Sequence, residues 1–393
     1  MSIRIAHTGR EACARGRPAA RPRCPRPLDP CYTLPMIRPS RGGTRFGRAS
    51  LAPAPLALAL YLLTAFRAAG AFAAAPPLER TVNNLLGTTC TIRLYTGGSA
   101  AALDAAVARI AQIEDRMTVS RGGSEVIRIN AAAGQHPVAV TSDVLEVIRQ
   151  GLRYSGDGDG AYDITVEPLV KLWAIGFPGA RVPAPEEIRR ARSLIGWRDV
   201  VVDEKASTVF LRRPGMGLDL GSIAKGYAAD EAARVLRASA VEAGLIDLGG
   251  NILTFGPKPD GSKWRIGIQN PLEARGTKLG IVEIPDGSVT TAGTYERFFE
   301  KDGKRYFHIL DARTGYPAWN GLAAVSVVAP DSTSADGYDT LVFTLGLDQG
   351  RKFVQSTRGK IEAIFITDQR QVYVTPGLRS RFTLTDRSFT LLP

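Results

Sequence analysis

The residues best suited to chemistry lie in one stretch toward the C-terminal end of the chain, residues 307–346. The stretch opens with His308, one of only two histidines outside the arginine-rich N-terminal tail. Further on, Asp336, Asp339 and Thr340 have spacings of three and four residues, which place side chains on or near one face of an expected helix. Two carboxylates and a hydroxyl are the oxygen ligands that a hard ion such as magnesium prefers. The pattern therefore indicates a metal or phosphate site near the start of that helix.

A purely structural explanation of the two acids is also open. Carboxylates in the first turn of a helix complement the positive end of its dipole, and they need no ligand for that. The preceding residues 323–329 form a β-branched run typical of a buried strand. The helix after this strand can be capped by Ser332 or Ser334. On this pattern Asp336 and Asp339 lie at the N-terminal end of the helix, where both explanations apply.

A second candidate ligand site lies upstream, in the sequence LDLGSIAKG at residues 218–226. It predicts the end of a strand, a turn at Gly221-Ser222 and a helix from about Ile223. An aspartate with an exposed serine or backbone oxygen at such a turn is a common ligand site. Gly221 and Gly226 are equally explained by close packing, because glycine has no Cβ. The segment fits neither G-x-G-x-x-G nor a P-loop, so the standard nucleotide-binding folds are not indicated.

Strands and helices alternate along the rest of the chain without a regular βαβ order. The patterns predict strands at residues 86–95, 199–202, 209–211, 263–269 and 280–283, a buried strand bent at Gly249-Gly250, a hairpin around Asp302-Gly303, and helices at 100–117, from Ser124, at 141–155 and at 185–194. This order predicts an α+β fold of mixed sheets with intertwined subdomains. No internal repeat or linker interrupts residues 74–393, which we expect to form one domain.

The net charge of the chain does not indicate a nucleic-acid partner, although its formal value is +12. Residues 1–73 contribute +10 of it, from twelve arginines against Glu11 and Asp29. Residues 74–393 carry the remaining +2 and show no basic run interleaved with aromatic residues, so no nucleic-acid binding is expected. Cys90 is the only cysteine of this part, which excludes a disulfide framework and favours a core position.

Residues 1–73 have the pattern of an N-terminal extension with a signal peptide. Met36, a candidate true start, is followed by four arginines, an apolar run at residues 51–66 and small residues up to Ala73. We therefore expect export to the periplasm and cleavage near Ala73. An uncleaved anchor at the inner membrane is the alternative, although the prolines in the apolar run and Arg67 after it leave a short span.

Six segments resemble, in order, those of the ApbE family, the FAD:protein FMN transferases. They are RMTVSRGGSEVIRIN, GAYDITVEPLVKLW, DLGSIAKGYAAD, LIDLGGNI, TTAGTYERFFEKDGKRYFHILDARTGYP and APDSTSADGYDT. One such segment is a weak signal, but all six in sequence span most of residues 80–350. The resemblance implies a periplasmic or membrane-surface enzyme that binds FAD and Mg²⁺. It also implies that the enzyme attaches FMN through a phosphoester to a Ser or Thr of a partner flavoprotein and releases AMP.

The same resemblance implies roles for individual residues. The metal would be held by Ser222, whose backbone oxygen is one candidate ligand, together with Asp336, Asp339 and Thr340. FAD would lie against Leu86, Ala161, Tyr162, Asp163, Asp219, Lys225 and Leu310. A divalent ion suits this chemistry because it neutralises charge on a breaking pyrophosphate. The acceptor hydroxyl gains from a positioned base, and His308 is the candidate because its intrinsic pKa lies near working pH. The alternative is a core histidine hydrogen-bonded to Asp311.

Ser120 departs from the family pattern. Members of the family often carry an aromatic residue after MTV that is thought to stack on the isoalloxazine ring, so the ring must use another partner here or bind less tightly. Two other functions stay open. One is hydrolysis of FAD to FMN and AMP with water as the acceptor, which metal-dependent AMP release without a protein acceptor would indicate. The other is a non-catalytic FAD-binding protein, which would hold FAD without turnover.

Overall fold

The computed structural model of the chain describes residues 77–393. Its main feature is a nine-stranded sheet. In spatial order the strands are β1 (Leu78–Leu85), β2 (Thr88–Gly97), β6 (Val241–Leu248), β7 (Ile252–Phe255), β10 (Gly287–Gly293), β15 (Leu322–Ala329), β16 (Glu362–Thr367), β17 (Gln371–Val374) and β19 (Thr390–Leu391). All neighbours are antiparallel except β17 and β19. Since β2 pairs with β6 and β10 with β15, segments far apart in the sequence build one sheet.

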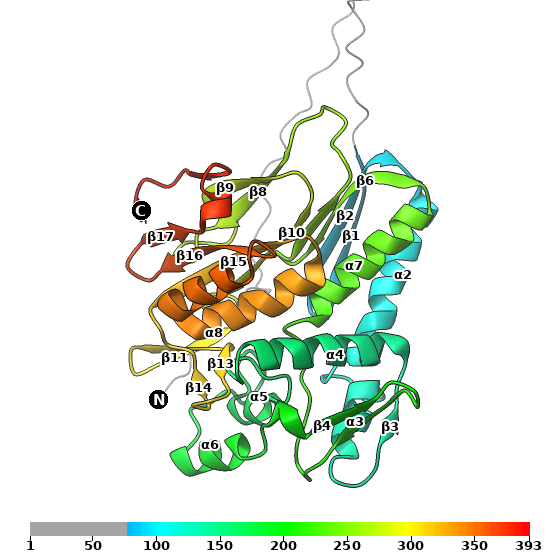
Figure 1. Cartoon of the computed structure of the whole chain (residues 1–393), viewed down its shortest axis with the longest axis vertical. Helices are drawn as coiled ribbons and strands as arrows, with labels where there is room; N and C mark the ends of the chain where they lie inside the picture. The colour runs from blue at the N-terminus through cyan, green and yellow to red at the C-terminus, as the bar shows by residue number, and fades with distance from the viewer. Residues whose placement is uncertain (1–76) are drawn as a thin grey trace, which may run out of the picture. The chain divides into compact units, whose positions relative to one another are not determined.

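Three helices pack on this sheet and position much of the candidate site (Figure 1). They are α2 (Ala100–Met117), α7 (Ala224–Ala238) and α8 (Ser332–Ser356). Helix α2 has the bounds expected from its apolar stripe, because Leu103, Ile110 and Ile113 are buried and the Ser99 hydroxyl accepts from the Ala102 N–H. Helix α7 packs through a row of alanines, which allows close approach to α2 and the sheet.

Smaller elements surround the large sheet. The other helices are α3 (Glu125–Ala131), α4 (Ser142–Asp157), α5 (Glu167–Trp173) and α6 (Pro185–Arg192), with 3₁₀ turns at Trp197–Asp199 and Pro376–Leu378. The small sheets are β3 (Val138–Ala139) with β5 (Thr208–Leu211) and β4 (Val200–Asp203); β18 (Phe382–Leu384) with β9 (Lys278–Ile284) and β8 (Trp264–Gln269); β11 (Phe298–Lys301) with β12 (Lys304–Phe307); and β13 (Leu310–Asp311) with β14 (Tyr316–Pro317). The mixture confirms the expected α+β fold.

The strand expected at residues 86–95 is β2, which begins two residues later, at Thr88, after a tight turn that joins it to β1. Leu86 and Gly87 have φ values of 53° and 68°, as in the two-residue turns that connect hairpins. Strand β1 before them escaped the pattern because nearly all of its side chains are exposed, so it shows no alternation of buried and exposed residues. A leucine with positive φ is uncommon, which marks this turn as a constrained position.

The strand end expected at Leu218 and Leu220 is also wrong, because this segment is an extended loop. Only an isolated bridge joins Gly217 to Val166. The amide side chain of Asn130 takes the place of a neighbouring strand, since its Oδ1 accepts from Leu218 N at 2.7 Å and its Nδ2 donates to Leu218 O at 3.0 Å. The backbone is therefore satisfied without a sheet.

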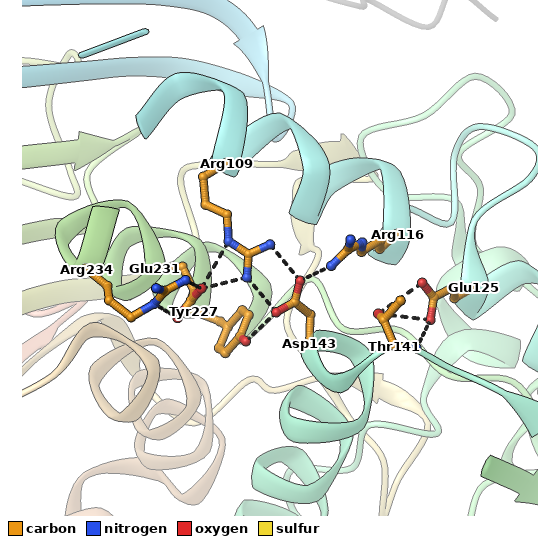
Figure 2. Close-up of polar contacts among 8 residues, drawn as sticks. All are labelled: Arg109, Arg116, Glu125, Thr141, Asp143, Tyr227, Glu231 and Arg234. Carbon is orange, nitrogen blue, oxygen red and sulfur yellow. Dashed lines mark hydrogen bonds and ion pairs between the residues drawn. The ribbon is translucent and has the colours of Figure 1, made fainter. Parts of the chain in front are cut away.

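A buried polar network joins α2, α4 and α7 (Figure 2). Arg109 on α2 donates to both carboxylate oxygens of Asp143 on α4, at 2.8 and 2.6 Å, and to Glu231 on α7 at 2.6 Å. Tyr227 on α7 and Arg116 on α2 donate to the same Asp143. Burial alone would raise the pKa of Asp143, but these donors outweigh it and lower the pKa. The network fixes α4 against the helix that carries Lys225.

Other expectations concern the ends and the core of the chain. The expected signal peptide at residues 1–73 lies outside the described residues. Within residues 77–393, no helix combines the length and the apolar character needed to cross a membrane. Cys90 is buried with a free thiol that donates to the Leu85 carbonyl oxygen, so it is a core residue as expected.

Candidate active site

Helices α7 and α8 cross in close contact at Gly226. A Cβ at this position would lie 2.2 Å from the carbonyl oxygen of Ser332 and 2.8 Å from the Cβ of Asp336, so the approach requires glycine. The N–H of Gly226 donates to Oδ2 of Asp336 at 2.9 Å, and Nζ of Lys225 donates to its Oδ1 at 2.9 Å. The two segments that the sequence marked as ligand sites therefore meet at Asp336.

Asp336 and Asp339 form a buried acidic pair, with only 3% and 4% of their surfaces exposed. Burial raises the pKa of Asp339 well above its usual range, Asp336 raises it further, and Lys225 lowers it only in part. Burial alone would lower the pKa of Lys225, but attraction to the two carboxylates raises it overall. Thr340 donates its hydroxyl to Oδ1 of Asp339 at 3.1 Å. If both carboxylates were ionised, the pair would carry more negative charge than Lys225 compensates, and this is why the pKa of Asp339 is raised.

The alternative that these acids complement the dipole of a first helical turn is wrong. Helix α8 begins at Ser332 and its cap is Asp331, which precedes both Ser332 and Ser334, the caps that the sequence suggested. Its first turn contains no acidic residue, so Asp336 and Asp339 lie deeper in the helix, where the dipole effect has faded. The first N–H groups of α8 have other acceptors, including Asp230 on α7.

The acidic pair has the chemistry of a site for a hard divalent ion. Within residues 77–393 no group of three or more His, Cys, Asp or Glu side chains converges, so Asp336 and Asp339 would be the charged ligands. Mg²⁺ is usually held by one or two carboxylates together with substrate phosphates and water. Two buried carboxylates beside one ammonium leave charge that a cation would neutralise, so the residues present fit Mg²⁺.

The turn before α7 is joined to the loop that carries Tyr162. The Ser222 hydroxyl donates to the Tyr162 hydroxyl at 3.0 Å. Burial raises the pKa of Tyr162, so it stays protonated. In the same turn, Asp219 accepts from Gly221 N at 2.8 Å; burial raises the pKa of Asp219, while the Gly221 N–H and the charge of Arg297 lower it in part. The structure thus brings Ser222, Asp219 and Tyr162 into one group.

Two other residues were predicted to contact FAD, Ala161 and Asp163. Their side chains are buried or hydrogen-bonded within the protein. Ala161 is fully buried. Asp163 accepts from the Thr165 N–H and hydroxyl at 2.8 and 2.7 Å through one oxygen, and from Trp197 N at 3.1 Å through the other. A ligand at this loop would therefore meet backbone atoms before it met the carboxylate. The FAD contacts of both residues stay predictions.

One ring nitrogen of His308 is buried. Its backbone N–H donates to the Arg297 carbonyl at 3.1 Å, but its Nδ1 has no hydrogen-bond partner among the described residues. The alternative of a core histidine bonded to Asp311 is wrong, because the carboxylate of Asp311 accepts from Arg313 and no hydrogen bond joins it to His308 among the described residues. Burial, followed by the charges of Arg297 and Lys225, lowers the pKa of His308 to about 4. The imidazole is thus neutral at working pH, the form that accepts a proton.

Arg297 is a candidate that the sequence reasoning missed. It is exposed, and its guanidinium lies 5.7 Å from the ring centre of Phe177. A Cβ on Gly87 would lie 3.5 Å from its Nη2, so it borders the turn that carries Leu86. Its charge also acts on Asp219 and His308. A single arginine in TYERFF has no spacing that marks it, and only the fold brings it beside these residues.

Leu310, the last predicted FAD contact, and Ser120, the departure from the family pattern, lie on other elements than the acidic pair. Leu310 is half-buried in β13 and packs against the apolar cluster that contains Trp173. Ser120 is exposed, with its hydroxyl 2.9 Å from that of Thr118. A ligand that reached Leu310 as well as Asp336 would have to extend from α8 to the β13–β14 hairpin.

Comparisons with known proteins agree on one family. A family model described as the ApbE family matches residues 86–365. The FAD:protein FMN transferase of Klebsiella pneumoniae (strain 342) is 41% identical over 308 residues, which cover 78% of this chain and 95% of the relative. That of Treponema pallidum (strain Nichols) is 35% identical over 324 residues, which cover 78% of this chain and 89% of the relative.

Solved structures show the same similarity in three dimensions. The ApbE protein of Thermotoga maritima superposes with a TM-score of 0.71 at 30% identity and covers 77% of this chain and 97% of its own. The flavin transferase ApbE of Vibrio cholerae has a TM-score of 0.69 at 29% identity, with 78% and 100% covered. The family model covers more than half of the chain, and the relatives and structures agree with it, so the chain belongs to the ApbE family.

Proposed function

We propose that this chain transfers FMN from FAD to a Ser or Thr hydroxyl of a partner flavoprotein, releasing AMP in a reaction that depends on Mg²⁺. Its relatives are named FAD:protein FMN transferases, and the chain is a transferase of their family. The observation that carries the chemistry is the buried pair of Asp336 and Asp339 beside Lys225, with the neutral His308 close enough for that lysine to lower its pKa.

The reaction exchanges one phosphorus–oxygen bond for another. The acceptor oxygen forms a bond to the phosphorus of the FMN half of FAD. The bond from that phosphorus to the bridging oxygen breaks, and the bridging oxygen leaves with AMP. The hydroxyl proton passes to a base, and no atom changes its oxidation state. Such displacements depend on positioning and on compensation of phosphate charge.

The residues of the site can divide this work between them. Asp336, Asp339, Thr340 and an oxygen of Ser222 would hold Mg²⁺. The bound ion would neutralise charge on the pyrophosphate. Lys225 places a further positive charge beside the pair. His308 would accept the hydroxyl proton, since its ring is neutral and its Nδ1 has no partner among the described residues.

FAD would lie between the groups that the structure joins around this centre. The contacts we propose are those at Leu86, Ala161, Tyr162, Asp163, Asp219, Lys225 and Leu310. For Ala161 and Asp163 we expect backbone contacts, because the Asp163 carboxylate already has three donors. The exposed Arg297 is an additional cation for the phosphates, because it borders the Leu86-Gly87 turn and acts on Asp219.

Incubation with FAD, Mg²⁺ and a candidate periplasmic flavoprotein tests the proposal. We expect the intact mass of the acceptor to increase by one FMN residue, with an equal amount of AMP released and with both signals lost in EDTA. AMP without a mass increase would indicate hydrolysis of FAD instead. Bound FAD without any AMP would indicate a flavin-binding protein and would contradict the proposed transfer.

The histidine can be tested by itself. His308→Ala should keep FAD affinity and lose transfer by about 10²–10⁴-fold, the usual contribution of a general base. His136→Ala is the matched control, because His136 is exposed in a turn where its ring lies 3.0 Å from the Pro137 carbonyl oxygen. Initial rates of AMP release, with FAD affinity from flavin fluorescence, separate the two effects. Transfer at the parent rate in His308→Ala would show that His308 is structural.

We also propose that the protein acts in the periplasm after export, released or held at the inner membrane. The support is the order of basic, apolar and small residues up to Ala73. N-terminal sequencing of material from the periplasm decides it. A mature chain that begins near residue 74 agrees with cleavage, whereas one that retains residues 51–66 is anchored.

A further inference from the structure

We propose that the acceptor protein docks as an added β-strand on the outer edge of β11, through a segment rich in acidic residues. The inference rests on the proposed function, because it concerns the protein substrate of that reaction. The β11–β12 hairpin lies apart from the large sheet, at the margin of the described structure (Figure 1). Four features of the hairpin carry the proposal: its direction, its open edge, its rigid attachment and its composition.

The hairpin starts and ends at the candidate active site. Phe298 and Phe307 pair at the end of the hairpin that joins the rest of the chain. Beyond this pair, on the side away from the turn, come Arg297 before β11 and His308 after β12. The His308 N–H donates to the Arg297 carbonyl at 3.1 Å. A strand laid along β11 would therefore lead toward His308, and a serine or threonine beyond its end would lie close to the proposed base.

The outer edge of β11 has backbone groups free for pairing. In an antiparallel ladder, residue pairs that bond to each other alternate with pairs whose N–H and C=O groups point outward. Because His308 and Arg297 are a bonded pair, the outward groups of β11 belong to Phe298 and Glu300. Among residues 77–393, β11 has β12 as its one strand neighbour. Such an edge accepts an extended segment from another chain.

The opposite edge is covered and the hairpin is firmly attached. On β12 the outward carbonyl of Arg305 accepts from Nε1 of Trp319 at 2.9 Å. Phe299 and Tyr306 stack with ring centres 5.1 Å apart, and Tyr306 lies 5.8 Å from the buried Trp173. The aromatic contacts fix the hairpin before a partner arrives, which reduces the entropy lost on binding. A docking strand thus has one available edge, and it is the edge of β11.

Large apolar side chains are exposed around this edge. In residues 77–393 the exposed large apolar residues are Leu78, Phe177, Phe298, Trp319 and Leu391. Phe298 lies on β11 itself, Trp319 bonds to β12, and Phe177 lies beside Arg297. Aromatic residues and arginine supply much of the binding energy of protein interfaces. Three of the five therefore gather where the acceptor has to approach.

The charge of the hairpin indicates an acidic partner. Residues 297–305 carry four cations against two acids. One acid, Glu300, is already paired with Arg305 at 3.0 Å, so the cations in excess include Lys301 and Lys304 on either side of the Asp302-Gly303 turn. Complementary charge speeds association and favours the correct partner. We therefore expect acidic residues in the acceptor segment.

Substitutions at Glu300 isolate the edge. Glu300→Pro removes the outward N–H of β11 and keeps the ladder to β12, as proline on an edge strand can. Glu300→Ala is the matched control, because it loses the same ion pair with Arg305 and keeps the N–H. Phe298→Ala tests the apolar contact by a second route. Thermal melts and FAD affinity should be unchanged in all three.

The probes are two short peptides that each contain one serine between alternating valines, one peptide with aspartates and the other with lysines. Anisotropy of labelled peptide measures docking, and peptide mass after incubation with FAD and Mg²⁺ measures transfer. We expect the parent chain to bind the acidic peptide in preference, Glu300→Pro to weaken this by about tenfold, and Glu300→Ala to change it little.

Each result decides the docking or the transfer. Equal binding in Glu300→Pro and Glu300→Ala, no preference for the acidic peptide, or no peptide bound by the parent chain would overturn the docking site. If Glu300→Pro misfolds, the same comparison is made between Phe298→Ala and Glu300→Ala, and equal binding there overturns it as well. Peptide that docks in this pattern but receives no FMN would instead count against the proposed function.

Discussion

Burial and two neighbouring cations keep the His308 imidazole neutral, which has a consequence for pH dependence. A histidine with a lowered pKa holds its proton only below that pKa, so His308 stays neutral down to about pH 4. The unfolded chain binds the same proton near pH 6.5. Stability from this residue is therefore complete above about pH 6.5 and is lost as the pH falls toward 4. A phosphate ligand between His308 and the two cations would raise the pKa and strengthen the base.

Arg297→Gln should raise the pKa of His308, because it removes one of the cations that oppose protonation. The acid limb of kcat/KM, which reports the free enzyme, should move to higher pH by the same amount. An NMR titration of the His308 ring measures the shift directly. Arg305→Gln, which removes a hairpin cation stacked on Phe298, should leave the titration unchanged. An unaltered His308 pKa in Arg297→Gln would mean that burial alone sets it.

Asp339→Asn should stabilise the chain in the absence of divalent ions. Burial and Asp336 raise the pKa of Asp339, so its ionised form disfavours the folded state as the pH rises above about 4. Removing that charge should raise Tm at neutral pH, and the gain should disappear near pH 4. The Asn side chain can still accept from Thr340. A lower Tm at neutral pH would contradict this account of the charge.

Asp336→Asn is the contrasting variant. It weakens acceptors used by Lys225 and Gly226, so it should lower Tm where Asp339→Asn raises it. Both variants should need more Mg²⁺ for AMP release, because each removes one carboxylate from the proposed ion site, and excess Mg²⁺ should partly restore turnover. An unchanged Mg²⁺ concentration for half-maximal activity in Asp336→Asn would contradict the proposal that Asp336 is a ligand of Mg²⁺.

At the scale of elements, the position of α8 depends on α7. Asp230 on α7 accepts from Ser332 N at 2.9 Å and from the N–H and hydroxyl of Thr333 at 2.8 and 2.5 Å. Gly226 lets the two helices approach, and Lys225 pairs with Asp336 one turn further along α8. The acidic pair therefore lies where α7 holds it, and a residue without contact to the ligand can alter metal binding.

Asp230→Ala should weaken divalent-ion binding more than the loss of an ordinary helix cap does. Asp331→Ala is the matched control. Asp331 caps the same helix by accepting from Ser334 N at 2.7 Å, but it directly precedes α8 in the sequence and does not lie on α7. Both variants should lower the free energy of unfolding, and the loss of the Asp331 cap should cost about 0.5–2 kcal/mol. Mn²⁺ binding followed by EPR separates the roles. Equal Mn²⁺ affinities in the two variants would show that Asp230 acts only as a cap of α8.

Elements with a strong local signal were predictable from the sequence. The stripe of Leu103, Ile110 and Ile113 predicts α2, and Asp302-Gly303 predicts the hairpin because both residues take the positive φ that its turn needs. Signals that depend on distant partners were not predictable. The loop at Leu218 resembles a strand because the pairing by Asn130, far away in the sequence, cannot be seen.

The candidate site divides in the same way. Asp336, Asp339 and Lys225 could be marked from their segments, but only the fold shows that α7 and α8 join them. Asp336 and Asp339 lie beyond the first turn of α8 because the helix is capped by Asp331. The sequence suggested Ser332 or Ser334 as the cap instead. Arg297 carries no pattern of its own. The shift in the His308 pKa has the same origin, because its neighbours come from separate segments.

At the scale of the whole molecule, one polar network bears on how the helices stay assembled. Asp143 is 4% exposed and accepts from Arg109, Arg116 and Tyr227, which come from the two other helices of the network (Figure 2). Its lowered pKa means that the network favours the folded chain above the unfolded value of about 4. That contribution is lost as the pH falls through the pKa of the folded state.

Asp143→Asn should destabilise the whole described part of the chain rather than one helix. It leaves two guanidinium groups without their shared carboxylate, at a cost of about 1–3 kcal/mol in the free energy of unfolding. Glu146→Gln is the matched control on the same helix, because its pair with Arg149 is exposed and should contribute about 0.5 kcal/mol or less. Urea unfolding at neutral pH measures both. The difference between parent and Asp143→Asn should persist down to about pH 4 and shrink below it, since protonation then removes the same charge from the parent. A cost equal to that of Glu146→Gln would mean that α2, α4 and α7 are held together by their apolar contacts alone.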